Sequence, residues 1–287
     1  LRRGDHTIKF GAQLAFLDLS RTVNDHFNGS YYYVNPGAAG TFDPAVNAPY
    51  GARINIAPTP TVQGNDTQIG LYIQDEWRPD EHWTFNFGLR WDLETNNNNN
   101  DYVTPAAIAT ALRNYPGWAA RGIDPEDYIS NGNNRDPQWD AFQPRIGFAY
   151  DVNADRQTVI FGGAGRYYDR SLFIAGVIET LTNSNNVVTV NFGAACAATP
   201  RPTYCTDPAA LRTFAQSLGT GGSVFVLNNR TEMPYSDQFN LGIRQRFGGI
   251  QTSLTLAHIR SHNIFQYVRA NFYTNGWYSR FLTRDAG

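Results

Sequence analysis

The sequence predicts an all-β fold: an antiparallel up-and-down meander that forms part of a large transmembrane outer-membrane β-barrel, with long outer loops that carry short helices. Three observations support this prediction. About seven segments alternate apolar and polar residues as pleated strands do. Tryptophans border the best-formed apolar run, and short connections alternate with long ones. At roughly 3.3 Å per residue and a tilt of about 40°, eleven residues rise about 25 Å, the height of the apolar band of such a barrel.

The segment from Asp66 to Glu94 shows the strand pattern most clearly. Its second half has an apolar residue at every odd position, namely Trp83, Phe85, Phe87, Leu89, Trp91 and Leu93. Even positions are polar or small, so the two sets lie on opposite faces. The first half repeats the pattern, and Arg78-Pro79-Asp80 forms the turn. Trp77, Trp83 and Trp91 stand near the ends of the apolar runs, as aromatic girdles at the two water boundaries require.

The other strands are predicted by the same alternation. One runs from about Asp5 to Leu19, and residues 20–65 then read as a long irregular segment. Two strands, about 145–152 and 156–168, are joined by a short turn at 153–155. Two more, about 236–247 and 250–261, are joined at Gly248-Gly249.

Two helices are predicted within the long connections. One has Thr104 as its cap and Pro105 at its first position, and it stops near Pro116. The other has Asp207 as its cap, Pro208 at its first position and Gly219 just after its end.

The order of connections gives the strongest indication of a membrane barrel. Long segments follow Leu19, Glu94 and Tyr168, whereas short turns lie at Pro79, Asn153 and Gly248. All short turns therefore fall at one end of the meander, which faces the periplasm in outer-membrane barrels, and the long loops face outside. A soluble β-protein with long amphipathic hairpins is the alternative, but soluble sandwiches mix loop lengths at both ends.

Composition excludes some classes of function. The formal net charge of −2 over 287 residues lacks the basic excess of a nucleic-acid-binding protein. No apolar run approaches the roughly eighteen residues of a membrane-spanning helix. The mean hydropathy of −0.43 does not argue against a barrel, because alternation hides apolar residues from window averages.

Three hairpins resemble those of TonB-dependent outer-membrane receptors, and the set is most similar to the Oar-like group. The matching stretches are GLYIQDEWRPDEHWTFNFGLRWD, PRIGFAYDVNADRQTVIFGGAGRYYDR and PYSDQFNLGIRQRFGGIQTSLTLAHIRSHN. They cover about a third of the chain, in the family's order and spacing. Phe161 departs from the family pattern, which often has Arg there, and 258–261 matches only loosely.

The resemblance implies a barrel of about 22 strands around an internal plug, which imports scarce nutrients with energy relayed by TonB. Residues 1–287 are then interpreted as part of the barrel domain, without the plug and the terminal parts. The expected partners are outer-membrane lipid, the TonB complex through the plug, and an unidentified ligand such as a siderophore, an oligosaccharide or a peptide. A surface adhesion or binding barrel without transport, and a soluble carbohydrate-binding β-sandwich, remain as alternatives.

No catalytic residue, cofactor or metal site is predicted, and we expect the protein not to be an enzyme. Gly162–Gly165 follows a strand as a phosphate loop would, but no helix signal follows and the only lysine is Lys9. His258 and His262 would be about 13 Å apart on a strand, too far to share a metal. The Asn- and Asp-rich stretches 96–101 and 131–136 could hold Ca²⁺, although disordered polar loops explain them more simply.

Several residues are candidates for binding or loop structure. Cys196 and Cys205, nine apart in one Pro-rich loop, suit a disulfide outside the cell, with two free thiols as the alternative. The candidates for the lumen-facing wall are Glu76, Arg90, Arg244 and Arg246, which could dock a plug or merely solvate the wall. The candidates for ligand contact are the loop aromatics Tyr115, Trp118 and Tyr204.

Overall fold

Eight strands form one open antiparallel sheet in the computed structural model, which describes residues 1–34, 42–43, 46–57, 59–118, 122–170, 173–184, 187–218, 224–268 and 281–286. In spatial order the strands are β1 (Arg2–Arg3), β2 (His6–Thr22), β5 (Thr61–Trp77), β6 (Trp83–Glu94), β7 (Phe142–Asp151), β8 (Thr158–Tyr168), β11 (Tyr235–Phe247) and β12 (Ile250–His262). The seven long strands are those that alternation predicts, and neighbours pair in sequence order. The predicted fold class is confirmed.

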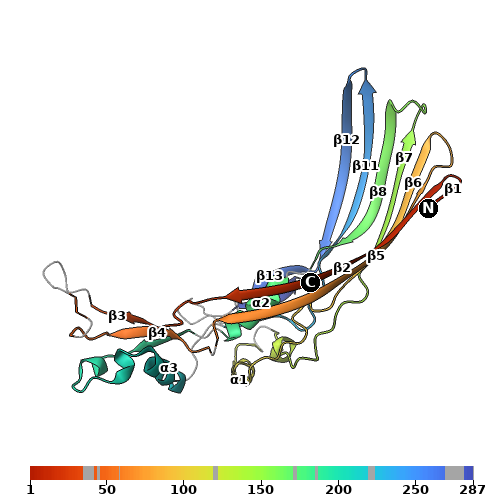
Figure 1. Ribbon diagram of the computed structural model, residues 1–287. Coiled ribbons are helices and arrows are strands. Elements are labelled where there is room, and N and C mark those ends of the chain that lie inside the picture. Colours follow the sequence, from red (N-terminus) through yellow and green to blue (C-terminus); the bar gives the residue numbers. More distant parts are fainter. Residues whose placement is uncertain are drawn as a thin grey trace.

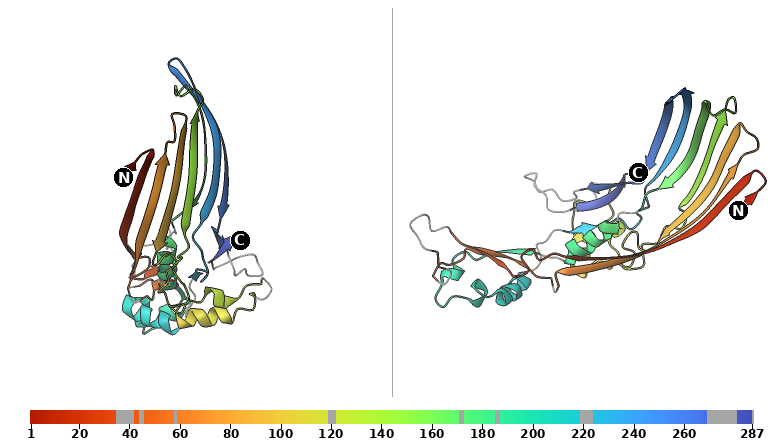
Figure 2. Two further views of the ribbon diagram at one scale, coloured as in Figure 1. Left: turned by 90° about the vertical axis from the view of Figure 1, so that its right-hand side faces the viewer. Right: turned by 45° about the horizontal axis from the view of Figure 1, so that its top comes forward.

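The two ends of the sheet differ as the connection lengths predict. Short turns join β5 to β6, β7 to β8 and β11 to β12 at one end of the curved sheet (Figure 1). The helices and small extra sheets gather at the other end (Figures 1 and 2). The sheet is a section of wall, because β12 and β1 form its two edges without pairing with each other.

The first hairpin is longer than predicted. β2 and β5 pair continuously from His6↔Trp77 to Thr22↔Thr61. Its far end extends beyond the other strands toward the loops (Figure 1). There Leu19 and Val62 pack against Val177 and Leu181 of α2 (Phe173–Ser184). The apolar contacts with α2 explain why pairing continues where Leu17 and Leu19 break the simple alternation.

The two faces of the sheet differ in chemistry. One face exposes apolar side chains from β2 to β12, including Phe10 (73 % exposed), Phe16 (74 %) and Leu256 (71 %). On the opposite face, register aligns Asn86 with Gly147, Gly163 and Asn240 across β6, β7, β8 and β11. Polar and small residues therefore line the inner face of the wall, and the apolar face is the one that lipid covers.

Aromatic clusters border the apolar face at both ends. At the short-turn end, Trp83 stacks on Phe85 with ring centroids 5.1 Å apart and packs on Tyr150 at 4.6 Å. At the long-loop end, Trp91 stacks on Trp139 at 6.2 Å. Both clusters match the girdles that amphipathic rings form at membrane boundaries.

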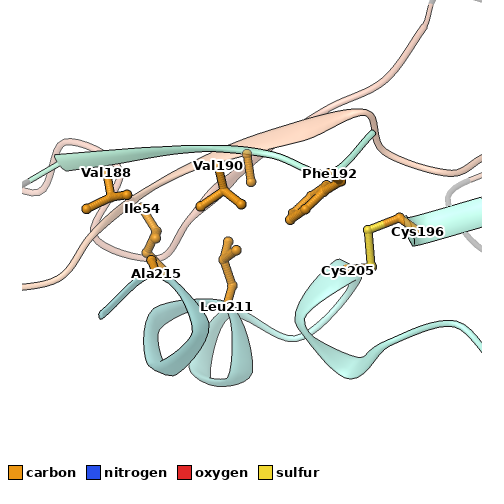
Figure 3. Packing of buried hydrophobic residues seen from close by; sticks show 9 residues of the cluster. Ile54, Val188, Val190, Phe192, Cys196, Cys205, Leu211 and Ala215 are labelled. Atoms are coloured by element: carbon orange, nitrogen blue, oxygen red, sulfur yellow. A yellow bond between two sulfur atoms is a disulfide. The ribbon is translucent and has the colours of Figure 1, made fainter. Parts of the chain in front are cut away.

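One loop unit has its own hydrophobic core (Figure 3). A small sheet of β3 (Ser30–Tyr32), β4 (Gly51–Asn55) and β9 (Val187–Asn191) covers α3 (Pro208–Ser217). Ile54, Val190 and Leu211 meet in this core, each 2 % exposed or less. Asp207 caps α3 by accepting a hydrogen bond from the Ala209 N–H at 2.9 Å, as predicted.

The remaining loop elements are α1 (Ala106–Arg113), α2, the 3₁₀ turns η2 (Pro125–Tyr128), η3 (Ala195–Ala197) and η4 (Thr203–Cys205), and a second small sheet of β10 (Phe225–Val226), β14 (Phe281–Ala286) and β13 (Ile264–Val268). The predicted Thr104 cap of α1 is wrong. Pro105 occupies the cap position, and the Thr104 hydroxyl accepts from the Ser130 N–H at 2.9 Å. Within the described ranges, no helix combines the length and apolarity needed to cross a bilayer.

Cys196 and Cys205 are joined by a disulfide, with Cα atoms 5.7 Å apart and both side chains fully buried beside Phe192 and Tyr204. We expect the double variant Cys196→Ser/Cys205→Ser to destabilise this loop unit by roughly 2–3 kcal/mol, because the bridge closes a short loop. Faster amide hydrogen exchange in β9 and α3 of the full-length protein, with unchanged exchange in β6, is the expected measurement. Unchanged exchange in α3 would contradict it.

Candidate functional site

A belt of polar side chains crosses the inner face near its long-loop end. Arg90 on β6 forms an ion pair with Asp92, through Nε–Oδ2 at 2.7 Å and Nη2–Oδ1 at 2.6 Å. The same guanidinium donates to Gln13 Oε1 on β2 at 3.2 Å. Gly70 on the intervening β5 leaves room for this pair, since a Cβ there would lie 2.6 Å from Arg90 Nη2.

The belt continues onto the next two strands. Gln143 on β7 donates its amide N–H to Asp92 Oδ2, and its Oε1 accepts from Arg145 Nη2 at 3.0 Å. The Arg145 guanidinium lies 4.3 Å from the centre of the Tyr167 ring on β8. Hydrogen bonds therefore join residues of β2, β6 and β7 into one array, and a cation–π contact adds Tyr167 of β8 to it.

The chemistry of the belt suits binding. It offers two guanidinium groups, one carboxylate, amides and a phenol ring, all on the face away from lipid. A polar ligand or a plug surface could replace any of these contacts with equivalent hydrogen bonds. A cavity of about 20 Å³ beside Arg90, Asp92 and Arg170 has room for about one water molecule.

Of the four residues predicted to face the lumen, only Arg90 joins this belt. Glu76, Arg244 and Arg246 share its face by register but lie toward the short-turn end. Glu76 forms an ion pair with Arg78 of the turn at 2.8 Å. Arg246 donates to the Gly248 carbonyl at 3.3 Å, and Arg244 is exposed. The other belt residues, Gln13, Asp92, Gln143, Arg145 and Tyr167, were missed, although Gln13 and Asp92 fall on the polar face that alternation predicts.

A buried ion pair holds the long loops together above the wall. Arg135 and Glu179 have fully buried side chains and bind each other twice, at 2.6 and 2.9 Å. Arg135 also donates to the carbonyls of Asn98 and Leu227 and to Asn229 Oδ1. Glu179 accepts from Asn99 Nδ2 at 3.0 Å and from the Leu227 N–H at 2.9 Å.

Polar side chains around the ion pair also form hydrogen bonds with one another and with the backbone. Asn183 Nδ2 donates to the Tyr102 hydroxyl at 2.9 Å and to the Phe225 carbonyl. Burial raises the pKa of Tyr102, and the Glu179 carboxylate raises it further, so the phenol stays neutral at physiological pH. The pair thus joins α2 to three loop segments that are distant in sequence. No local pattern predicts it, because its two members are 44 residues apart.

The Asn-rich stretch is part of this arrangement, and the prediction of a disordered loop at 96–101 is wrong. Asn96, Asn97, Asn98 and Asn100 are each at most 9 % exposed. Asn96 Nδ2 donates to the Asn65 carbonyl, and Asn100 Nδ2 donates to the Arg135 carbonyl. Within the described residues, no group of three His, Cys, Asp or Glu side chains could hold a metal ion.

The three loop aromatics predicted to contact ligand pack inside the loop units. Trp118 is 6 % exposed, and its indole N–H donates to the Leu112 carbonyl at 2.6 Å. Tyr115 packs edge-on against Trp118 at 5.1 Å. Tyr204 stacks on Phe214 at 4.1 Å, and its backbone carbonyl accepts from Tyr31. For Trp118 the burial argues against ligand contact, whereas for the half-buried Tyr115 and Tyr204 such contact stays a prediction.

Comparison with known proteins agrees with this architecture. Residues 1–276 match the family described as outer membrane beta barrel domain. The outer membrane transporter YddB from Escherichia coli is similar in structure, with a TM-score of 0.53 and 15 % identity, over 99 % of this chain and 26 % of that one. No curated protein sequence matches.

Two other receptor structures are similar to a lower degree. The ferric enterobactin receptor PfeA of Pseudomonas aeruginosa, in its G324V mutant, gives a TM-score of 0.46 and 11 % identity, over 98 % of this chain and 28 % of that one. The siderophore receptor PirA of the same organism gives 0.43 and 11 %, over 97 % and 37 %. The chain therefore spans 26–37 % of the length of these proteins.

The match covers nearly the whole chain, and the apolar outer face, the two aromatic borders and the order of short and long connections agree with it. The chain belongs to the outer membrane beta-barrel domain family, and its place is the cell outer membrane.

Proposed function

We propose that this chain forms part of the wall and the extracellular loops of a TonB-energised importer of a scarce nutrient. The polar belt from Gln13 to Tyr167 carries the proposal, because it gives the inner face a continuous set of hydrogen-bonding groups just below the loops. The resemblance of the three hairpins to TonB-dependent receptors, Oar-like ones above all, supports this assignment.

In this proposal the belt binds whatever occupies the lumen. Its residues lie on neighbouring strands at the level where the loops begin, so a ligand that has passed the loops meets the belt next. The plug that the family resemblance implies would meet the same groups from within the barrel. Both uses need the alternating acceptors and donors that Arg90, Asp92, Gln143 and Arg145 present.

The test uses the full-length receptor in isogenic cells with and without TonB. Labelled ferric catecholate, maltodextrin and a short peptide serve as separate probes. We expect one probe to accumulate inside the cells only when TonB is present. Binding that is equal in both strains, with no accumulation of any probe, would favour the adhesion alternative and contradict import.

Within that assay, Arg90→Ala is expected to lower the uptake of the transported probe roughly tenfold, because a hydrogen bond to a charged group is lost. Lys9→Ala is the matched control. Lys9 lies on β2, on the inner face that also carries Arg90, but outside the belt, so its removal takes away one positive charge without touching the belt. The contrary result is an Arg90→Ala receptor that is present at normal levels and still imports as fast as the Lys9→Ala receptor. That result would contradict the proposed role of the belt in import.

A further inference from the structure

Two tyrosine rings lie on the inner face at the level of the polar belt, and we call this pair the tyrosine platform. Tyr72 on β5 pairs in register with Arg90 on β6. Tyr167 lies on β8, and its ring contacts the Arg145 guanidinium. Three strand spacings separate β5 from β8, which is roughly 14 Å at about 4.8 Å per spacing. A ligand that touches both rings must therefore be extended along the wall.

The Tyr72 ring lies flat against the wall. A Cβ at Gly11 on β2 would lie 2.6 Å from the Tyr72 Cε1, 2.7 Å from its Oη and 2.8 Å from its Cζ. Because these distances are nearly equal, the plane of the ring covers the Gly11 backbone. Tyr72 is 42 % exposed, so the other face of the ring is open to the lumen. An apolar ligand surface can stack on that open face.

The Tyr167 ring has a second planar group beside it. The Arg145 guanidinium lies 4.3 Å from the ring centre, and its Nη2 donates to Gln143 Oε1 at 3.0 Å. Arg145 is exposed and has five N–H groups, so it keeps donors for a ligand. This end of the platform therefore combines a flat surface with hydrogen-bond donors.

Between the two rings the charges are largely balanced. Arg90 binds Asp92 through two hydrogen bonds, at 2.7 and 2.6 Å. Gln13 and Gln143 add neutral amides that bond to this ion pair. An anionic ligand would have to displace Asp92 from Arg90. A neutral ligand with many hydroxyls can donate to the carboxylate and accept from the N–H groups without breaking the pair.

We propose that the tyrosine platform and the belt bind a neutral oligosaccharide. This names the substrate class of the importer and rests on the proposed function for the transport step. The C–H faces of two sugar units stack on Tyr72 and Tyr167, and hydroxyls between them bond to the belt. A sugar unit has an apolar face and a polar rim, and the wall presents flat rings and hydrogen-bonding groups at one level. The balanced charge of Arg90 and Asp92 favours this occupant over a ferric catecholate, which is anionic.

The experiment measures binding to the purified full-length protein in detergent, without TonB, by isothermal titration calorimetry. Maltohexaose and cellohexaose are the oligosaccharide probes, with a ferric catecholate and a tetra-alanine peptide as separate arms. We expect an oligosaccharide to bind, and Tyr72→Leu to weaken its binding roughly tenfold, because the flat ring is lost while apolar bulk remains. Tyr167→Leu should act likewise and tests the other ring separately. Tyr72→Phe keeps the ring and should bind like the unmodified protein.

Phe161→Leu is the matched control. Phe161 also lies on the inner face of β8, where a Cβ at Gly242 would be 2.6 Å from its Cζ. It is six residues from Tyr167, roughly 20 Å toward the short turns, so its replacement should leave binding unchanged. Equal weakening in Phe161→Leu and Tyr72→Leu, or a protein that binds neither oligosaccharide, would overturn the proposal.

This result is independent of the import assay. Oligosaccharide binding without TonB-dependent uptake would contradict the importer and leave the tyrosine platform as a binding site. TonB-dependent uptake of the ferric catecholate or the peptide, by a protein that binds neither oligosaccharide, would leave the importer and overturn the oligosaccharide site.

Discussion

Arg135→Met is expected to destabilise the loop region by about 3–5 kcal/mol, because it leaves the Glu179 carboxylate buried without its cation. The loss should spread through the loops, since the guanidinium also bonds to Asn98, Leu227 and Asn229. Hydrogen exchange by mass spectrometry on the full-length protein is the measurement. Peptides covering 96–101, 173–184 and 224–229 should exchange much faster, while those of β6 and β7 should not change.

Two control variants separate the effect of losing the buried ion pair from that of losing any charged side chain. Arg113→Ala breaks the surface pair with Glu126, in which both side chains are more than half exposed, and should change loop exchange little. The double variant Arg135→Met/Glu179→Met removes both charges and should lose less stability than Arg135→Met alone, because apolar replacement of a buried pair is often tolerated. Arg135→Met loops that exchange like those of Arg113→Ala would show that the ion pair does not hold them.

Phe87→Arg is expected to destabilise the barrel by about 2–4 kcal/mol. Phe87 lies on the apolar face of β6, 40 % exposed, where lipid surrounds it. A guanidinium there would enter the hydrocarbon region, and the carboxylate directly across on β5, Asp75, already binds His6 at 2.7 Å. Reversible denaturant unfolding of the full-length barrel in lipid vesicles, followed by tryptophan fluorescence, measures the change in the free energy of unfolding.

Asn86→Arg is the control for that experiment, since it places the same side chain one residue away on the inner face. Asn86 aligns with Glu76 on β5 and Gly147 on β7. The new cation would face polar groups and water, so its cost should be far smaller. Similar losses at the two positions would mean that the facing of β6 is assigned wrongly.

The sequence by itself determined the strands, their faces and the two ends of the wall. In β6 the odd positions 83–93 are apolar and the even ones polar or small, and a period of two has only one arrangement on a pleated strand. The connection at Pro79 is short and the one after Glu94 is long, and this difference in length determined which end of the sheet carries the loops. The cap at Asp207 and Pro208 determined the start of α3, because capping depends on neighbouring residues only.

Only the tertiary structure decided which polar residues act together. Arg90 was expected on the inner face, but its bonds to Gln13 and its link through Asp92 to Gln143 depend on strand register and on neighbours far along the chain. The Asn-rich stretch looked disordered because composition alone cannot show that Arg135 and Glu179 come from other loops to bond with it. Trp118 looked available for ligand until packing placed it in a core. Alternation and capping are local, whereas the partners of a buried polar group are chosen by the whole fold.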